Sequence, residues 1–145
     1  MTAYADTGLL CSLYAPDAHT GRVVARMQRQ ALPLPLTWLH QLEFRNALRL
    51  RVLRGEITPP QRDASLNALL ADVAAGVLAA AAPPLAETLT EAERLSALHT
   101  ETTGTRSLDV LHVSSALVLG LAEFLTLDHR QRALAKAAGL KVPAL

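Results

Sequence analysis

The chain has 145 residues, half of them hydrophobic, and its 14 Lys and Arg nearly balance its 13 Asp and Glu to leave a net charge of +1. This length predicts a single domain over residues 1–145 that buries one core of its own. The charge balance excludes a protein that binds nucleic acid through an overall positive charge, and one Trp, two Tyr and two Phe are too few for a base-stacking platform.

The sequence predicts a cytoplasmic protein with no membrane partner. No apolar run reaches the roughly 18 to 20 residues that span a bilayer. The start MTAYADTGLL has neither the basic region nor the extended apolar stretch of a secretory signal. Cys11 is the single cysteine, so it cannot form an intramolecular disulfide, and we expect it to behave as a small buried hydrophobe.

Short β-like runs alternate with helical stretches along the chain. This order predicts a single-domain three-layer α/β/α fold of the α/β class, with a mostly parallel central sheet of four to five strands. The expected strands, in chain order, are Thr2–Asp6, Leu34–Thr37, Val77–Ala81, Glu123–Leu127 and a weak Lys141–Val142.

Capping residues and glycines predict where the helices begin and end. A helix from about Leu39 to Arg54 ends at Gly55. Thr58-Pro-Pro-Gln61 predicts a capping box for the next helix, and Thr90-Glu-Ala-Glu93 predicts a second one. The last two helices are expected to open at Ser107 and at Asp128 with Gln131, and to end at Gly120 and Gly139.

Four acidic residues stand where strands meet helices, or on the core side of a helix: Asp6, Glu43, Asp109 and Asp128. In open sheets, ligands bind beyond the carboxyl ends of the strands, so we expect these four to converge there. Each of three has an ordinary alternative: Asp6 as a turn residue, Asp109 opposite a helix dipole and Asp128 as an N-cap. Glu43 shares the side of an apolar helix with Asn46 and would need a partner.

Four converging carboxylates need cations, and their hard oxygen atoms favour Mg²⁺ or Mn²⁺ over zinc. His112 lies three residues after Asp109 and is expected to orient that carboxylate, to touch phosphate or to pack against the sheet. Arg106 and Arg130 adjoin two of the acids and are the preferred candidates for contacts with RNA phosphates.

These motifs together resemble the PIN-domain ribonucleases. The residues that carry the resemblance are Asp6-Thr7, Glu43 with Asn46, Asp109 in RSLDVLHVSSA, and Thr126-Leu-Asp128. Within that family the chain looks most like VapC-type toxins of toxin/antitoxin pairs. The resemblance implies a Mg²⁺- or Mn²⁺-dependent endoribonuclease, a hydrolase in which Asp6, Glu43, Asp109 and Asp128 hold the metal and are catalytic. Thr7 and Thr126 would support them, whereas Gly8 stands where many relatives have Ser.

The resemblance also implies an RNA substrate, a cognate antitoxin and a homodimer. Amphipathic helices could supply the contact surface through Val23, Val24, Met27, Leu66, Leu69, Leu70 and Val73. Two alternatives keep the fold: an RNA-processing nuclease without an antitoxin, and a PIN-like binding module without catalysis. A receiver domain is discounted, because VLAAAAPP offers no phosphoacceptor after the third strand.

Overall fold

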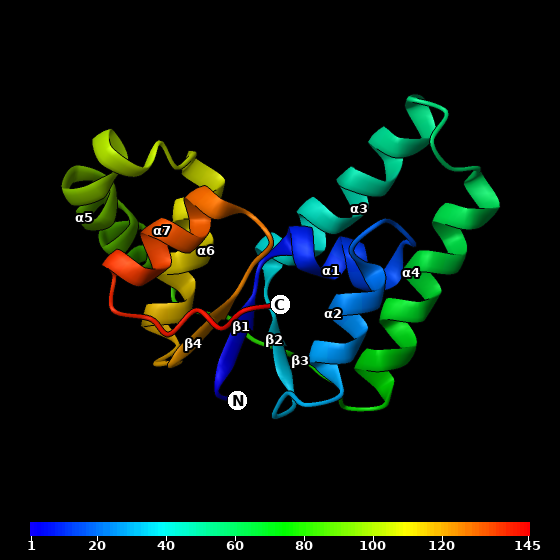
Figure 1. The fold of residues 1–145 in the computed structure, drawn as a ribbon, viewed down its shortest axis with the longest axis horizontal. Coiled ribbons are helices and arrows are strands. Elements are labelled where there is room, and N and C mark those ends of the chain that lie inside the picture. The colour runs from blue at the N-terminus through cyan, green and yellow to red at the C-terminus, as the bar shows by residue number, and fades with distance from the viewer.

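The computed structural model describes residues 1–145 as four short strands between two groups of helices (Figure 1). The strands are β1 (Ala3–Ala5), β2 (Leu34–Leu36), β3 (Leu78–Ala80) and β4 (Glu123–Leu125). The helices are α1 (Thr7–Tyr14), α2 (Thr20–Met27), α3 (Trp38–Leu53), α4 (Pro59–Ala74), α5 (Leu85–Thr103), α6 (Ser107–Val118) and α7 (His129–Ala137). In Figure 1, α1 to α4 lie on one side of the strands and α5 to α7 on the other.

The predicted central sheet of four to five strands is wrong. The strands form two separate parallel pairs, β1 with β4 and β2 with β3, and each strand has only three residues. The expected fifth strand is reduced to a single bridge between Glu123 and Lys141. Helices therefore make up most of the regular structure, although the positions of the four strands were predicted correctly.

The two pairs stay separate because the facing edges of β1 and β2 cannot form a complete ladder. Leu34 and Leu36 direct their backbone groups toward β3, so Pro35 between them faces β1, where it has no N–H to donate. Directly after β1, the Asp6 N–H donates to the Leu125 carbonyl of β4, so the backbone of Ala5 faces the other way. The Ala5 carbonyl contacts His40 Nε2 at 2.7 Å, so a side chain takes the place of a strand.

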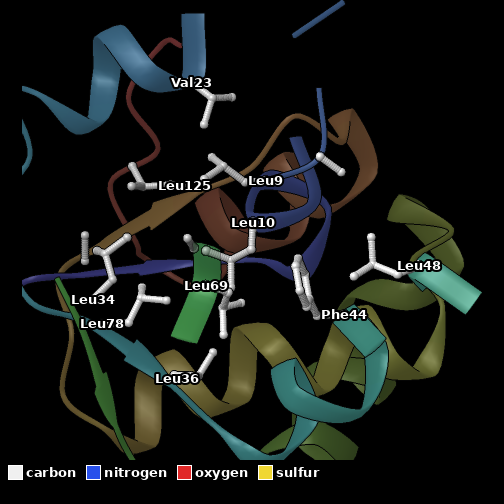
Figure 2. Close-up of a cluster of buried hydrophobic side chains, with 13 residues drawn as sticks. Leu9, Leu10, Val23, Leu34, Leu36, Phe44, Leu48, Leu69, Leu78 and Leu125 are labelled. Carbon is white, nitrogen blue, oxygen red and sulfur yellow. The ribbon is translucent and has the colours of Figure 1, made fainter. Parts of the chain in front are cut away.

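Successive residues of the strands enter two different cores. Ala3 and Ala5 of β1 face a cluster built with α1, α2, α3 and α4, and Tyr4 between them faces a cluster built with α5, α6 and α7. Figure 2 shows the first cluster, in which Leu9, Leu10 and Phe44 pack beside the strand leucines. The strands therefore separate the two helical groups and fix where the residues that follow each strand can lie.

The helix signals were confirmed in part. Thr58 and Gln61 form the predicted capping box of α4, and Asp128 caps α7. The capping box predicted at Thr90 is wrong, because α5 begins earlier and the Thr90 hydroxyl donates to the Ala86 carbonyl within that helix. The N-cap of α6 is Arg106, one residue before the predicted Ser107.

The amphipathic helices predicted to supply a contact surface are α2 and α4, and both place apolar residues in the core. Val23 and Leu69 are buried, whereas 38% of Val24 and 45% of Leu70 are exposed. No helix of this fold is long and apolar enough to cross a membrane.

Candidate functional site

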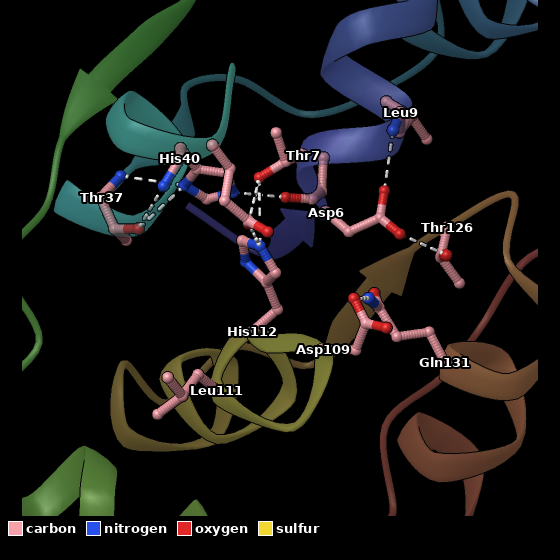
Figure 3. Close-up of polar contacts among 12 residues, drawn as sticks. Asp6, Thr7, Leu9, Thr37, His40, Asp109, Leu111, His112, Thr126 and Gln131 are labelled. Atoms are coloured by element: carbon pink, nitrogen blue, oxygen red, sulfur yellow. Dashed lines mark hydrogen bonds and ion pairs between the residues drawn. The ribbon is translucent and has the colours of Figure 1, made fainter. Parts of the chain in front are cut away.

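Asp6 lies at the end of β1 and caps α1, and it is buried. Its Oδ1 accepts from Leu9 N–H at 2.8 Å, and its Oδ2 accepts from the Thr126 hydroxyl at 2.5 Å (Figure 3). Burial raises the pKa of Asp6 to about 6, and the charge of Asp109 acts in the same direction against these hydrogen bonds. Two hydrogen bonds thus hold Asp6 in place, while burial disfavours its charged form.

Asp109 lies in the first turn of α6 and is partly buried. Its Oδ1 accepts a 2.6 Å hydrogen bond from Gln131 Nε2 on α7. Burial raises the pKa of Asp109, and the charges of Asp128 and Glu43 raise it further, whereas the Gln131 hydrogen bond lowers it. The charges of two other predicted acids therefore act on the pKa of Asp109, and its own charge acts on the pKa of Asp6.

Glu43 projects from α3 and is bound by two side chains through the same oxygen atom. Thr7 donates its hydroxyl to Oε1 at 2.9 Å, and His112 Nε2 lies 2.5 Å from Oε1. Burial alone would raise the pKa of Glu43, but the hydrogen bonds and charge of His112 and the Thr7 bond together lower it. Glu43 is the acid that the surrounding residues keep ionised.

His112 is buried between Glu43 and Tyr4. With Nε2 bearing the hydrogen that meets the Glu43 carboxylate, Nδ1 accepts from the Tyr4 hydroxyl at 2.8 Å. The ring also lies 4.9 Å from the His40 ring, measured between centroids. His112 is therefore hydrogen-bonded to Glu43 on another helix, and it makes no hydrogen bond to Asp109 on its own helix.

Asp128 is exposed and serves as the N-cap of α7. Its Oδ1 accepts from Gln131 N–H at 2.8 Å, and its own N–H donates to the Thr126 hydroxyl at 3.0 Å. Thr126 thus bonds to both Asp6 and Asp128. The capping bond to Gln131 is the only hydrogen bond that the Asp128 side chain makes.

Three of the other predicted residues are exposed: Asn46 on α3, Arg106 before α6 and Arg130 on α7. Arg106 lines a hollow of about 400 Å³ together with Glu43 and Asp109. Arg130 is not part of that lining. A larger hollow of about 530 Å³ between α5 and α6 contains none of the predicted site residues.

The four predicted acids do not come together as one metal site. No three acidic, histidine or cysteine side chains are arranged as a ready-made metal site. Asp6 and Asp109 face the same space in Figure 3, Glu43 is turned toward His112, and Asp128 caps its helix. Electrostatic effects still connect all four acids, because Asp109 raises the pKa of Asp6 while Glu43 and Asp128 raise that of Asp109.

Sequence reasoning did not predict the contacts of three residues in this region. These are the Tyr4 bond to His112, the His40 contact with the Ala5 carbonyl and the Gln131 bond to Asp109. Gln131 was recognised as a capping partner of Asp128, and nothing in the sequence indicated that its amide reaches α6. His40 caps α3 with Thr37 through Nδ1, a task usually done by Glu or Gln at that position. The sequence Thr37-Trp-Leu-His40 has that spacing and could have indicated it.

Comparison with known proteins gives the fold but no family. No family model matches the chain, and no curated protein matches it. A chain in the crystal structure of VapBC2 from Rickettsia felis, bound to a DNA fragment from their promoter, is similar with a TM-score of 0.65 and 12% identity, over 99% of this chain and 98% of that one. A chain in the crystal structure of FitAcB from Neisseria gonorrhoeae is similar with a TM-score of 0.66 and 16% identity, over 99% and 97%.

These findings correct the family assignment that was made from the motifs. No family model supports membership of the PIN-domain ribonucleases, identities of 12% and 16% show the fold alone, and the names of both matched structures refer to neither a nuclease nor RNA. The prediction that this chain is a PIN-domain ribonuclease is therefore wrong. The same findings overturn the predicted endoribonuclease activity, the hydrolase class and the RNA substrate. They also overturn the two alternatives that assumed a PIN domain.

Proposed function

We propose that this chain is one member of a toxin–antitoxin pair and that its acidic residues bind a divalent cation. The proposal of a pair is supported by the fold, since VapBC2 and FitAcB are toxin–antitoxin complexes and the likeness extends over 99% of this chain. Those names cover both members of each complex, so the function of this chain must be argued from its own residues. Its net charge of +1 does not favour a DNA-binding role for this chain.

The observation that carries the cation site is the placement of Asp6 and Asp109, two desolvated carboxylates from different elements that face the same space. Burial is the main reason that the pKa of Asp6 is raised, and a cation between the two carboxylates would offset the smaller contribution from the charge of Asp109. Their oxygen atoms suit Mg²⁺ or Mn²⁺, and Glu43 and Asp128 could contribute by turning from their present partners. A cation held there would polarise a water bound to it.

Calorimetric titration with MnCl₂ tests the cation site. We expect the wild-type protein to bind Mn²⁺ and Asp109→Asn to bind it at least about tenfold more weakly. Glu87→Gln changes an acid in the separate hollow between α5 and α6 and is expected to bind as the wild type does. The absence of heat from Mn²⁺ binding to the wild type, or equal binding by Asp109→Asn, would refute the site.

A protein partner is supported by apolar side chains that the fold leaves exposed. On α3, the exposed fractions are 41% for Trp38, 64% for Leu42 and 81% for Leu53. Burying such side chains stabilises an association by about 25 cal/mol for each Å² of apolar surface removed from water. The predicted homodimer and the second member of the pair would each use surface of this kind.

Co-expression with each protein encoded beside this chain tests the pair. We expect one neighbour to copurify with it as a complex of defined mass in light scattering after gel filtration, and Leu42→Glu to weaken that complex if α3 forms the contact. The mass of the chain alone determines whether it also pairs with itself. If neither neighbour forms a complex with the wild-type chain, membership of such a pair is wrong.

A further inference from the structure

Gln131 contains a buried acceptor that the protein does not satisfy. Only 2% of the residue is exposed, and its Oε1 has no hydrogen-bond partner. Leaving a buried polar atom unpaired costs about 1 to 3 kcal/mol, so such atoms are usually matched by a water, an ion or a ligand. A leucine could fill a buried helix position of this size without that cost.

The orientation of the Gln131 amide follows from its neighbour. Its nitrogen donates to Asp109 Oδ1 at 2.6 Å, and turning the amide over would place two oxygen atoms against each other at that distance. The amide therefore directs its N–H toward Asp109 and leaves Oε1 as the free acceptor. In Figure 3 the Gln131 side chain runs from α7 to the Asp109 carboxylate, beside the space that the Asp6 carboxylate also faces.

We propose that Gln131 is a positioning residue of the cation site, which holds Asp109 through Nε2 and accepts through Oε1 a hydrogen bond from a water bound to the cation. This inference rests on the proposed divalent-cation site. It explains why an amide occupies a buried helical position, because only a side chain with both a donor and an acceptor can hold a carboxylate and bind a coordinated water. It also adds a third element, α7, to a site formed by the start of α1 and the first turn of α6.

Three variants test the proposal by Mn²⁺ calorimetry and by the melting temperature with and without MnCl₂. Gln131→Leu removes both the donor and the acceptor, and we expect Mn²⁺ affinity to fall about 10- to 100-fold, as it does when other outer-shell partners of a metal ligand are removed. Gln131→Glu places a third carboxylate beside Asp109 and Asp6. We expect its melting temperature to fall without metal and to rise on addition of Mn²⁺ by more than that of the wild type.

Gln41→Leu is the matched control, because Gln41 is exposed on α3 and its side chain is hydrogen-bonded only to Arg45. It should bind Mn²⁺ as the wild type does. A folded Gln131→Leu variant with wild-type Mn²⁺ affinity would overturn the inference while leaving the cation site in place. If that variant does not fold, Gln131→Glu decides: a Mn²⁺-dependent rise no larger than that of the wild type overturns the inference. A wild-type protein that binds no Mn²⁺ would refute the cation site itself.

Discussion

Thr126 donates its hydroxyl to Asp6 Oδ2 at 2.5 Å and so joins the residue that follows β4 to the residue that follows β1. The same hydroxyl accepts from the backbone N–H of Asp128 at 3.0 Å. One buried threonine therefore fixes both the acid that ends β1 and the cap that begins α7.

Thr126→Val is expected to lower the free energy of unfolding by about 1 to 3 kcal/mol, because it leaves Asp6 Oδ2 and the Asp128 N–H without a partner. Urea denaturation at neutral pH measures the change. Thr126→Ser keeps the hydroxyl and should retain most of the stability. Equal losses in the two variants would mean that the methyl group, and not the hydroxyl, is what matters.

Asp6→Asn is expected to make the protein more stable at pH 7 to 8 and to leave it unchanged near pH 4. Burial raises the pKa of Asp6 from 3.8 to about 6, so the wild type carries no penalty below the lower value, and stability is lost as pH rises through the higher one. The gain from the variant is at most about 3 kcal/mol. Urea denaturation across this pH range, without divalent cations, provides the measurement. The exposed Glu101→Gln should follow the wild-type profile, and a gain from Asp6→Asn that does not vary with pH would contradict this account.

His40→Gln is expected to flatten the loss of stability in acid. Burial, and then the charge of His112, lower the pKa of His40 from 6.5 to about 3, so the stability present above pH 6.5 is lost as the pH falls toward 3. This loss is on the order of a few kcal/mol. Glutamine at the third helical position can preserve the capping box with Thr37, although it gives up the ring packing against Tyr4. Denaturation profiles from pH 4 to 8 that stay parallel for the variant and the wild type would refute this explanation.

Thr58→Ala is expected to lower the free energy of unfolding by about 1 kcal/mol, because Thr58 accepts from Gln61 N–H as the N-cap of α4. Thr90→Ala is the matched control. Thr90 lies inside α5, where alanine is the better helix former, so we expect no loss of stability. Thermal unfolding of the two variants compares a cap that was predicted correctly with one that was not, and equal losses would contradict the assignment of the caps.

The sequence predicted the positions of the strands well because each is a short apolar run bounded by turn residues. It failed for the sheet because pairing depends on individual edges: Pro35 removes a donor from the edge of β2 that faces β1, and His40 binds the Ala5 carbonyl. Neither effect appears in hydrophobic periodicity. Thr90 was misjudged for a similar reason, since a capping pattern inside a longer helical stretch looks the same as one at its start.

For the candidate site, the sequence identified the acidic residues but not their partners. Spacing along one helix paired His112 with Asp109, whereas the fold brings His112 to Glu43, 69 residues earlier in the chain. Gln131 was recognised only for its local contact with Asp128. Contacts between distant segments depend on which core each face of a strand enters, and short motifs carry no such information. The same limit explains why motifs alone were a poor basis for naming a family.

The break between β1 and β2 has a consequence for cooperativity. Asp6 follows β1, and Glu43 lies on the helix after β2, so the two carboxylates lie on opposite sides of the boundary between these strands. Side-chain hydrogen bonds from Thr7 and His40 cross this boundary in place of a backbone ladder. Local opening occurs most easily where few backbone bonds cross a boundary. A cation bound by acids from both sides would bridge that boundary, and amide exchange along the facing edges of β1 and β2 would then slow more than exchange elsewhere in the protein.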